Sequence, residues 1–441
     1  MAAAIGFLMI IVIVALLLKG KMSPIVVLAI VPTISALILG FVPTDILGFV
    51  PTDILGFIAD GIKTTTSNGI LFIFSVIYFG VLSDTGLFDV IVNWLVKKAG
   101  NNVIAVTVVT AMIATIAHLD GTTAVTVLIT IPAMYPVYKR MNIDARILLC
   151  ITGACMGVMN LLPWGGPTAR AATVLQMDAT ELWHMLIPLQ IVGLVMNSVI
   201  AVLLGMYAVK KGAGAGKGVE VETNEKEKAE TEALKKSRGY LIFNFLLTVA
   251  VIAALSTGVG KSYVIFMLGL CVLLAVNYPD QKIQDKLVKK HAPAALIISA
   301  TLFAAGAMVG IFDGTGMLEA MANAIMAVIP AAMGKYIHII FGILALPFGL
   351  CVGTDAYFYG IMPLVMQVGE TYGVASLNTA LTMLIGKNLA LMVSPLVPAT
   401  YLAIGLTGTE LKDHMKFSIP PYYVVSLIML VLGVILGIIS L

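Results

Sequence analysis

The sequence predicts an all-α polytopic membrane protein built from two inverted repeats. Three observations indicate this fold class. The 441-residue chain is 60% hydrophobic and only 11% charged, with a mean hydropathy of +1.04, whereas soluble domains are about one quarter charged. Apolar runs of spanning length recur along the chain, and some are interrupted by polar residues or prolines. Finally, motifs of the N-terminal half return in the same order in the C-terminal half.

Ten apolar runs reach the length that a membrane-spanning helix requires. We interpret the first as a helix rather than a signal peptide, because it lacks a basic start and a convincing cleavage site. The four cysteines lie in apolar stretches without CxxC spacing, so neither a disulfide framework nor a cysteine metal site is predicted. The runs lie near residues 4–18, 24–42, 68–82, 146–176, 185–209, 240–256, 262–278, 293–312, 377–407 and 419–440.

Two further apolar regions, 102–136 and 336–368, are interrupted midway by polar residues. Each is long enough for two half-depth helices joined at a tip, which is a re-entrant hairpin. Two of the ten spans, 146–176 and 377–407, contain paired prolines in "NLLPWGGPTAR" and "SPLVPAT", which predict broken helices near the membrane midplane. Irregular backbone at membrane depth requires hydrogen bonds from surrounding protein or from a water-filled cavity.

The distribution of basic residues predicts the orientation. If the turn at Lys19 and Lys21 is cytoplasmic, most of the 26 basic residues fall in cytoplasmic segments. The positive-inside rule then supports ten spans with two hairpins and puts both termini outside. Three basic residues remain outside in this arrangement, namely Lys63, Lys261 and Lys335.

One long hydrophilic segment divides the chain. Residues 210–238 alternate glutamate and lysine, which is typical of a solvated linker, and the orientation above makes it cytoplasmic. An N-terminal half at 1–209 and a C-terminal half at 239–441 remain, each with one hairpin and one broken helix.

The two halves share a series of motifs. "GVLSDTGLF" at 80–88 corresponds to "GIFDGTGML" at 310–318, and each is followed by a short helix, a hairpin and a broken helix. The first short helix ends in Lys97 and Lys98, whereas the second has no such pair, so charge places them on opposite sides of the membrane. Repeats of opposite orientation are typical of secondary transporters.

A different repeat is "GFVPTDIL", which occurs at 40–47 and again at 48–55. Such an identical and local copy is interpreted as a tandem duplication in an outside loop, and no function is assigned to it.

The hairpin tips, "AHLDGTTA" at 117–124 and "CVGTDAYFYG" at 351–360, are candidate binding sites. Glycine permits the turn, and amides at half-helix N-termini suit carboxylates. Asp120 and Asp355 are candidate proton sites or ligands of a hard cation such as Mg²⁺ or Ca²⁺, and the alternative is that each caps the returning half-helix. His118 is a candidate proton relay. Three threonine hydroxyls can contact either ion: Thr122, Thr123 and Thr354.

Two basic residues lie within membrane segments. Arg170 follows the first break and Lys387 precedes the second. Arginine binds carboxylates bidentately and lysine acts as a point charge, so the pair predicts an anionic substrate. The alternative for each is that the long side chain extends to the membrane interface. Trp164, in the first break, either walls the pocket or packs.

In combination, "FGVLSDTGLFD", "AHLDGTTAVT", "NLLPWGGPTARA" and "CVGTDAYFYGIMPL" resemble the bacterial citrate–metal–proton symporter family of the ion transporter superfamily, over nearly the whole chain. The resemblance implies an inner-membrane protein that takes up citrate complexed to a divalent cation, driven by protons, with no prosthetic group. It also implies an elevator-type transport domain and a homodimer. The positions that would hold substrate and coupling ions are Asp120, Thr122, Thr123, Asn160, Gly165, Gly166, Thr168, Thr354, Asp355, Asn388, Ser394 and Thr400.

Other functions remain as alternatives. A sodium-coupled di- or tricarboxylate transporter or a cation/proton antiporter would use the same fold, although an antiporter does not need Arg170 and Lys387. An intramembrane enzyme would need a nucleophile–base set or a motif such as HExxH, and the sequence has neither. Inverted broken helices favour alternating access over a channel. The expected partners are metal–citrate, protons and the lipid bilayer, not nucleic acid.

Overall fold

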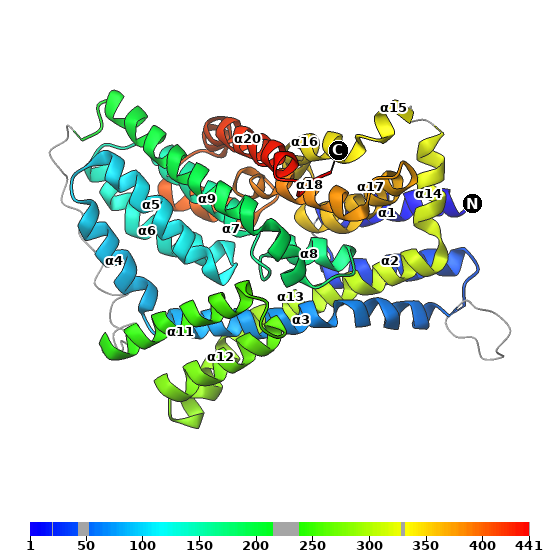
Figure 1. The fold of residues 1–441 in the computed structure, drawn as a ribbon, viewed down its shortest axis with the longest axis horizontal. Coiled ribbons are helices and arrows are strands. Elements are labelled where there is room, and N and C mark those ends of the chain that lie inside the picture. The colour runs from blue at the N-terminus through cyan, green and yellow to red at the C-terminus, as the bar shows by residue number, and fades with distance from the viewer. Residues whose placement is uncertain (20, 43–52, 215–237, 328–330, 441) are drawn as a thin grey trace.

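The computed structural model describes residues 1–19, 21–42, 53–214, 238–327 and 331–440, and these residues are predominantly helical (Figure 1). Within these ranges no strand forms, and an isolated bridge joins Val42 to Asp53. The all-α prediction is therefore confirmed. Most of the duplicated GFVPTDIL segment and most of the charged linker lie outside the described residues.

The helices of the N-terminal half follow the predicted order. They are α1 (Ala2–Lys19), α2 (Pro24–Ile38), α3 (Ile54–Asp84), α4 (Leu87–Ala99), α5 (Val103–Ala117), the short turn η1 (His118–Asp120), α6 (Thr123–Arg140), α7 (Ala145–Met159), α8 (Gly166–Val174) and α9 (Ala179–Lys210).

The C-terminal half contains a further set of helices. It comprises α11 (Arg238–Ser256), α12 (Ser262–Asn277), α13 (Gln281–Thr315), α14 (Met317–Met326), α15 (Ala331–Gly334), α16 (Ile337–Cys351), η2 (Ala356–Ile361), α17 (Met362–Thr371), α18 (Ser376–Asn388), η3 (Leu391–Val393), α19 (Pro398–Thr407) and α20 (Leu411–Ile435).

The motifs shared by the two halves form the same turn. Gly86 joins α3 to α4 with a φ of 77°, and Gly316 joins α13 to α14 with a φ of 64°. Residues other than glycine rarely adopt this left-handed backbone conformation, which explains why both corners contain a glycine. Each corner directs a long helix into a short one that precedes an interrupted helix pair.

The helix lengths differ from the ten predicted runs. In the described residues, six helices are long and apolar enough to cross a membrane: α3, α5 with η1, α9, α11, α13 and α20. Five apolar helices are shorter: α1, α2, α7, α12 and α16. The runs at 68–82 and 293–312 extend to helices of 31 and 35 residues, because polar residues at their ends also join the helix.

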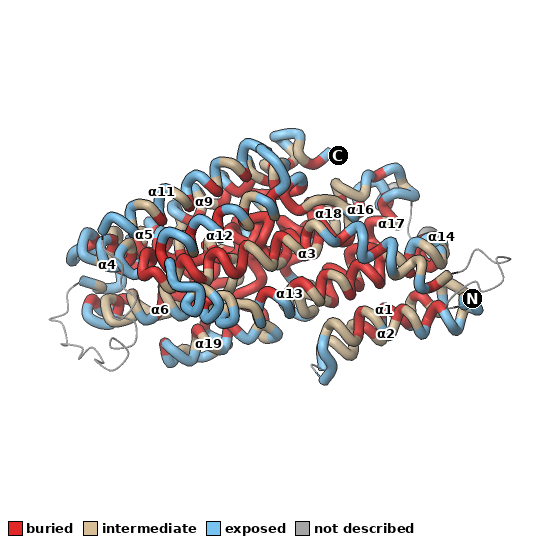
Figure 2. Tube along the Cα trace, turned by 90° about the horizontal axis from the view of Figure 1, so that it is seen from below, coloured by how far each residue is buried: buried red, intermediate tan, exposed pale blue. Residues whose placement is uncertain are grey.

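The two longest described helices, α3 and α13, pack against each other along the middle of the molecule (Figures 1 and 2). They run antiparallel, since Asp84 contacts Lys290 at one end whereas Gly61 faces Gly306 at the other. A Cβ atom on Gly61 would lie 2.1 Å from the Gly306 carbonyl oxygen. The missing side chains therefore allow backbone-to-backbone contact, and Figure 2 shows buried residues concentrated around this pair.

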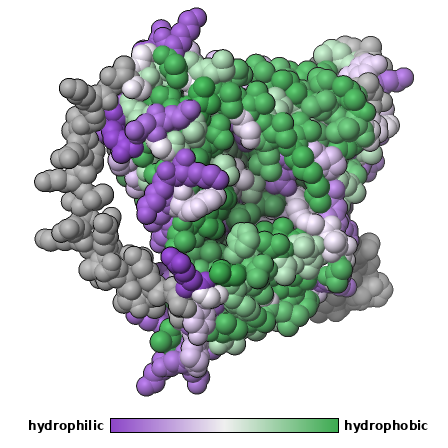
Figure 3. Space-filling model, turned by 60° about the vertical axis from the view of Figure 1, so that its left-hand side comes forward, coloured by the Kyte–Doolittle hydropathy of each residue, from purple (hydrophilic) through white to green (hydrophobic). Residues whose placement is uncertain are grey.

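The outer surface carries many apolar side chains. Ile191, Val195 and Val199 of α9 are 57%, 58% and 51% exposed. Figure 3 shows a face that is largely hydrophobic and hollowed near its middle. Extensive apolar exposure of this kind suits a lipid environment rather than water.

Candidate functional site

The first interrupted helix pair is α5 and α6, joined at η1 and Gly121. Gly121 has a φ of 72°, and a Cβ atom there would lie 2.8 Å from the Trp164 carbonyl oxygen. The Trp164 indole donates a 2.6 Å hydrogen bond to the carbonyl oxygen of Leu119. The first tip therefore lies directly on the first helix break.

Trp164 packs rather than lining an open pocket. It is 1% exposed, and its ring contacts those of Phe79, Trp183 and Phe266. Of the two alternatives from the sequence, packing is the one that the structure supports, with the indole N–H holding the tip.

His118 connects the same tip to the same break. Its ring is buried, with Nδ1 2.7 Å from the Thr126 hydroxyl and Nε2 3.2 Å from Asn160 Oδ1. Asn160 is the C-cap residue that follows α7, and its backbone carbonyl accepts a 2.8 Å hydrogen bond from Thr168 in α8. The side-chain nitrogen of Asn160 has no hydrogen-bond partner among the described residues. One donor is therefore buried and unused at this break.

Asp120 closes its own turn. Its carboxylate accepts hydrogen bonds from the Thr122 amide at 2.9 Å and from the Thr122 hydroxyl at 2.5 Å. Thr123 then begins α6, and both threonines are partly exposed. Asp120 therefore closes the turn before α6 without capping the helix itself, since Thr122 is the N-cap residue and no side-chain cap hydrogen bond forms there.

The glycines of the first break permit close backbone packing. A Cβ atom on Gly165 would lie 2.3 Å from the Asn160 carbonyl oxygen. Gly166 begins α8, and its carbonyl oxygen accepts a 2.9 Å hydrogen bond from Arg170 Nη1.

The second tip is likewise connected to the second break. Lys387, 3% exposed in the last turn of α18, donates a 2.9 Å hydrogen bond to the Thr354 hydroxyl. Its ammonium lies 5.5 Å from the ring centre of Tyr357 and 5.2 Å from that of Phe358. The Lys387 side chain is therefore engaged with the second tip inside the protein.

Hydroxyl groups fix the backbone of the second break. Ser394 donates to the Leu350 carbonyl oxygen at 3.3 Å, and Thr400 donates to the Ser394 carbonyl oxygen at 3.1 Å. Both hydroxyls are thereby engaged with the backbone. They shape the break and bring it against α16.

Asn388 is the last residue of α18, and Asn160 directly follows the last residue of α7. It is 3% exposed, and neither side-chain polar atom has a hydrogen-bond partner among the described residues. A Cβ atom on Gly157 would lie 2.9 Å from Leu389 Cα and 3.1 Å from the Asn388 carbonyl oxygen, so the two breaks touch. Buried amides without partners are costly, and a bound ligand would satisfy them.

The two halves are also joined by an ion pair. Arg170 Nε lies 2.6 Å from Asp355 Oδ1, and each side chain is 21% exposed. The Arg170 guanidinium therefore contacts the second tip. The residues are 185 positions apart, and the sequence gives no indication of their pairing.

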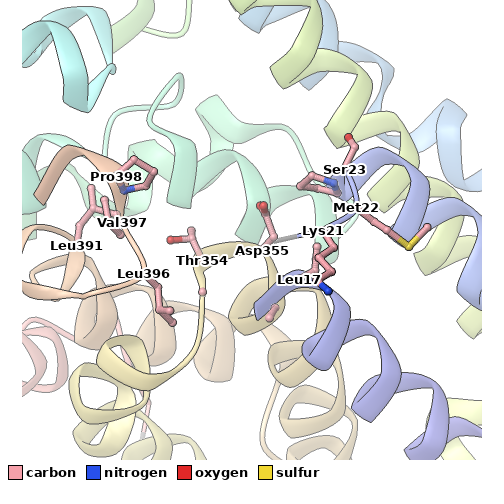
Figure 4. Close-up of a pocket in the computed structure, with 13 residues that line it drawn as sticks. Leu17, Lys21, Met22, Ser23, Thr354, Asp355, Leu391, Leu396, Val397 and Pro398 are labelled. Carbon is pink, nitrogen blue, oxygen red and sulfur yellow. The ribbon is translucent and has the colours of Figure 1, made fainter. Parts of the chain in front are cut away.

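A pocket of about 550 Å³ lies beside this ion pair (Figure 4). Thr354 and Asp355 stand at its centre, Leu396 to Pro398 of the second break form one side, and the turn between α1 and α2 forms the other. Arg170 and Lys387 are not among the residues that line the pocket, but each is hydrogen-bonded to a residue that is, Asp355 and Thr354 respectively. The pocket therefore lies beside two cations that already have partners at the second tip.

Lys21, in the α1–α2 turn, also lines this pocket. From the sequence, Lys21 indicates only the orientation of the chain, although its position next to the end of an apolar helix was a possible signal of a site. The residues predicted at the first tip do not line the pocket; they join it through Asn160 and the contact between the two breaks.

The citrate transporter family model matches residues 2–386. A Bacillus subtilis (strain 168) protein named citrate transporter is 35% identical over 440 residues, covering all of both chains. A second protein of that organism, named Mg(2+)/citrate complex secondary transporter, is 34% identical and matches all of this chain and 99% of its own.

Two solved transporters share the fold. The YdaH transporter of Alcanivorax borkumensis gives a TM-score of 0.63 and MtrF of Neisseria gonorrhoeae, described as one of a class of antimetabolite efflux pumps, gives 0.60. Each is 13% identical to this chain and covers 94% of it, with 97% and 95% of their own chains matched. The relatives and these structures are transporters rather than enzymes. With its family match and its full-length relatives, the chain belongs to the citrate transporter family.

Proposed function

We propose that this protein is a secondary active transporter that takes up citrate as a complex with a divalent cation of the Mg²⁺ or Ca²⁺ class, coupled to protons. The observation that carries this proposal is the second tip. There, one carboxylate (Asp355) and one hydroxyl (Thr354) face a pocket and are backed by two cationic side chains.

The chemistry of a metal–citrate complex suits this arrangement. Its carboxylates match Arg170 and Lys387, since guanidinium and ammonium groups bind carboxylate oxygens. Its hard cation matches Asp355 and Thr354, because such cations prefer oxygen ligands. The unused amides of Asn160 and Asn388 offer further donors and acceptors where the two breaks meet. The relative named for a Mg(2+)/citrate complex, 34% identical over its whole length, supports the same substrate.

Proton coupling is assigned to the first tip. His118 is buried between Thr126 and Asn160, so a proton on its ring would change the hydrogen bond at the first break. Asp120, 8% exposed, is the carboxylate of the same tip. A charge taken up in such a place is costly unless a substrate or a partner compensates it, which couples protonation to binding.

We further propose that the two tips are re-entrant hairpins and that α5–α8 and α16–α19 move together as an elevator domain. The close backbone contact between α3 and α13 supports a rigid scaffold for this motion. The scaffold would also form the homodimer, in a bacterial inner membrane.

The orientation has both termini outside and the linker in the cytoplasm. Figure 1 supports it in part, because the N-terminus lies at the opposite end of the long axis from the ends of α9 and α11 that flank the linker.

Uptake of labelled citrate into proteoliposomes under an imposed pH gradient tests the proposal. Uptake that requires Mg²⁺ or Ca²⁺ and the gradient, but not sodium, is expected. Uptake that survives EDTA and follows a sodium gradient would instead identify a sodium-coupled carboxylate transporter. Proton-driven cation exchange without citrate uptake would identify an antiporter.

A further inference from the structure

We infer that the Arg170–Asp355 ion pair selects the metal–citrate complex over its separate components. On binding, the cation of the complex takes the Asp355 carboxylate and a citrate carboxylate takes the Arg170 guanidinium, so that one ion pair is replaced by two. This inference rests on the proposed function, and it adds the physical reason why neither component alone would be a good substrate.

Asp355 limits access to the ion pair. Asp355 lines the pocket, whereas Arg170 is not among the lining residues and has its Nε 2.6 Å from the Asp355 carboxylate. A citrate carboxylate in the pocket therefore meets the Asp355 carboxylate, which carries the same charge. Because the Arg170 guanidinium is already paired, the anion gains this partner only if Asp355 turns away.

Charge balance at the ion pair distinguishes the complex from its separate components. Free citrate at Arg170 would leave Asp355 without its partner and beside another anion. A free divalent cation at Asp355 would leave Arg170 without its partner and beside another cation. Both outcomes leave an uncompensated charge in a largely buried place, which is strongly unfavourable. The complex brings both charges at once and leaves neither residue unpaired.

The pocket offers few ligands to a cation. Within the described ranges no group of three or more histidine, cysteine, aspartate or glutamate side chains could hold a metal ion. Asp355 is thus one carboxylate ligand, to which Thr354 adds a hydroxyl. Mg²⁺ commonly binds through one or two protein carboxylates and retains water and substrate oxygens. The pocket therefore suits a cation that arrives with citrate rather than one held by the protein alone.

Lys21 faces the same pocket from the α1–α2 turn and takes no part in the ion pair. Its positive charge attracts anionic citrate with or without bound metal. Lys21 therefore provides a matched control: its removal weakens binding of both forms, whereas removal of Asp355 changes the preference between them.

The test is equilibrium binding of labelled citrate to the purified full-length protein, once with saturating Mg²⁺ and once with EDTA. We expect the wild-type protein to bind the complex at least about tenfold more tightly than free citrate, because one form preserves both ion pairs and the other breaks one. Asp355→Asn should reduce this ratio to about threefold or less, with free citrate bound no more weakly than by the wild type. Asp355→Glu should retain the preference, and Lys21→Gln should lower both affinities at an unchanged ratio.

The outcomes separate the inference from the proposed function. A wild-type preference for the complex that persists in Asp355→Asn overturns the inference and leaves metal–citrate transport standing. Equal wild-type binding with and without Mg²⁺ also overturns it. A folded wild-type protein that binds citrate in neither condition overturns both proposals. Thermal unfolding of each variant shows whether it is folded, and the Asp355→Glu variant provides the comparison if Asp355→Asn does not fold.

Discussion

Replacing Lys387 by methionine should separate stability from function. Lys387 is 3% exposed, donates to the Thr354 hydroxyl at 2.9 Å and lies over two aromatic rings. Methionine fills a similar volume without the charge and suits contact with aromatic rings. The substitution therefore removes the ammonium while preserving most of the packing.

The substitution changes the free energy of unfolding through opposing contributions. The lost hydrogen bond to a charged donor is worth about 1.5–3 kcal/mol, and each lost cation–π contact is worth about 0.5–2 kcal/mol. Against these losses stands the burial of an ammonium ion, which costs several kcal/mol. We therefore expect the free energy of unfolding to stay within about 1 kcal/mol of the wild type or to rise.

Citrate binding should respond very differently. A carboxylate that meets Lys387 loses a buried ionic contact, so that binding should weaken at least about thirtyfold, corresponding to about 2 kcal/mol. Thermal unfolding and labelled-citrate binding measure the two effects on one preparation, and Lys63→Met, at an exposed lysine that does not line the pocket, is the control. A fall in the unfolding midpoint of more than about 5 °C, together with unchanged citrate affinity, would refute the reasoning.

Three further substitutions test other parts of the structure. Trp164→Phe removes the hydrogen bond to the Leu119 carbonyl. We expect the free energy of unfolding to fall by about 1–2 kcal/mol and amide hydrogen exchange at the first tip to become faster. Unchanged exchange at this tip would contradict the contact. Gly61→Ala puts a methyl group 2.1 Å from the Gly306 carbonyl oxygen. We expect the free energy of unfolding to fall by about 1–3 kcal/mol. An unchanged thermal unfolding midpoint would argue against backbone contact between α3 and α13. His118→Gln keeps a hydrogen-bonding side chain without a titratable ring. We expect this variant still to bind citrate but to lose uptake driven by a pH gradient. Gradient-driven uptake at the wild-type rate would exclude His118 as the proton site.

The helix breaks and tips were predictable because local chemistry determines them. Paired prolines in 160–170 and 394–400 remove backbone donors, and the structure has α7–α8 and α18–α19 interrupted there. Polar residues at 118–122 likewise interrupt α5 and α6. A sequence contains these restrictions directly, so no knowledge of the tertiary contacts was needed.

The helix ends were less predictable because a polar side chain can form its hydrogen bond within its own helix, which allows the helix to continue. The predicted run at 68–82 omitted the first turns of α3, which contain Thr64, Thr65 and Thr66. Their hydroxyls donate to carbonyl oxygens three or four residues earlier in the helix. Such internal hydrogen bonds allow a threonine-rich segment to continue a membrane helix although its hydropathy is low.

The ion pair between Arg170 and Asp355 was beyond prediction for another reason. Each residue was a candidate for the site, but whether two charged side chains meet depends on how the second tip lies against α8. That arrangement follows from packing between halves separated by the linker, for which a single sequence contains no pattern. Lys21 was missed on the same ground, because only the tertiary structure brings the α1–α2 turn to the pocket.

The two tips are held in different ways, and this difference affects how freely each tip can move. Asp120 closes its tip with local hydrogen bonds, whereas Asp355 ties its tip to the opposite half by an ion pair. A local cap of this kind moves with its own tip, whereas the second tip cannot separate from α8 unless Arg170 and Asp355 each find another partner. A substrate that supplies both partners would therefore release the second tip, while the first tip requires no such exchange of charges.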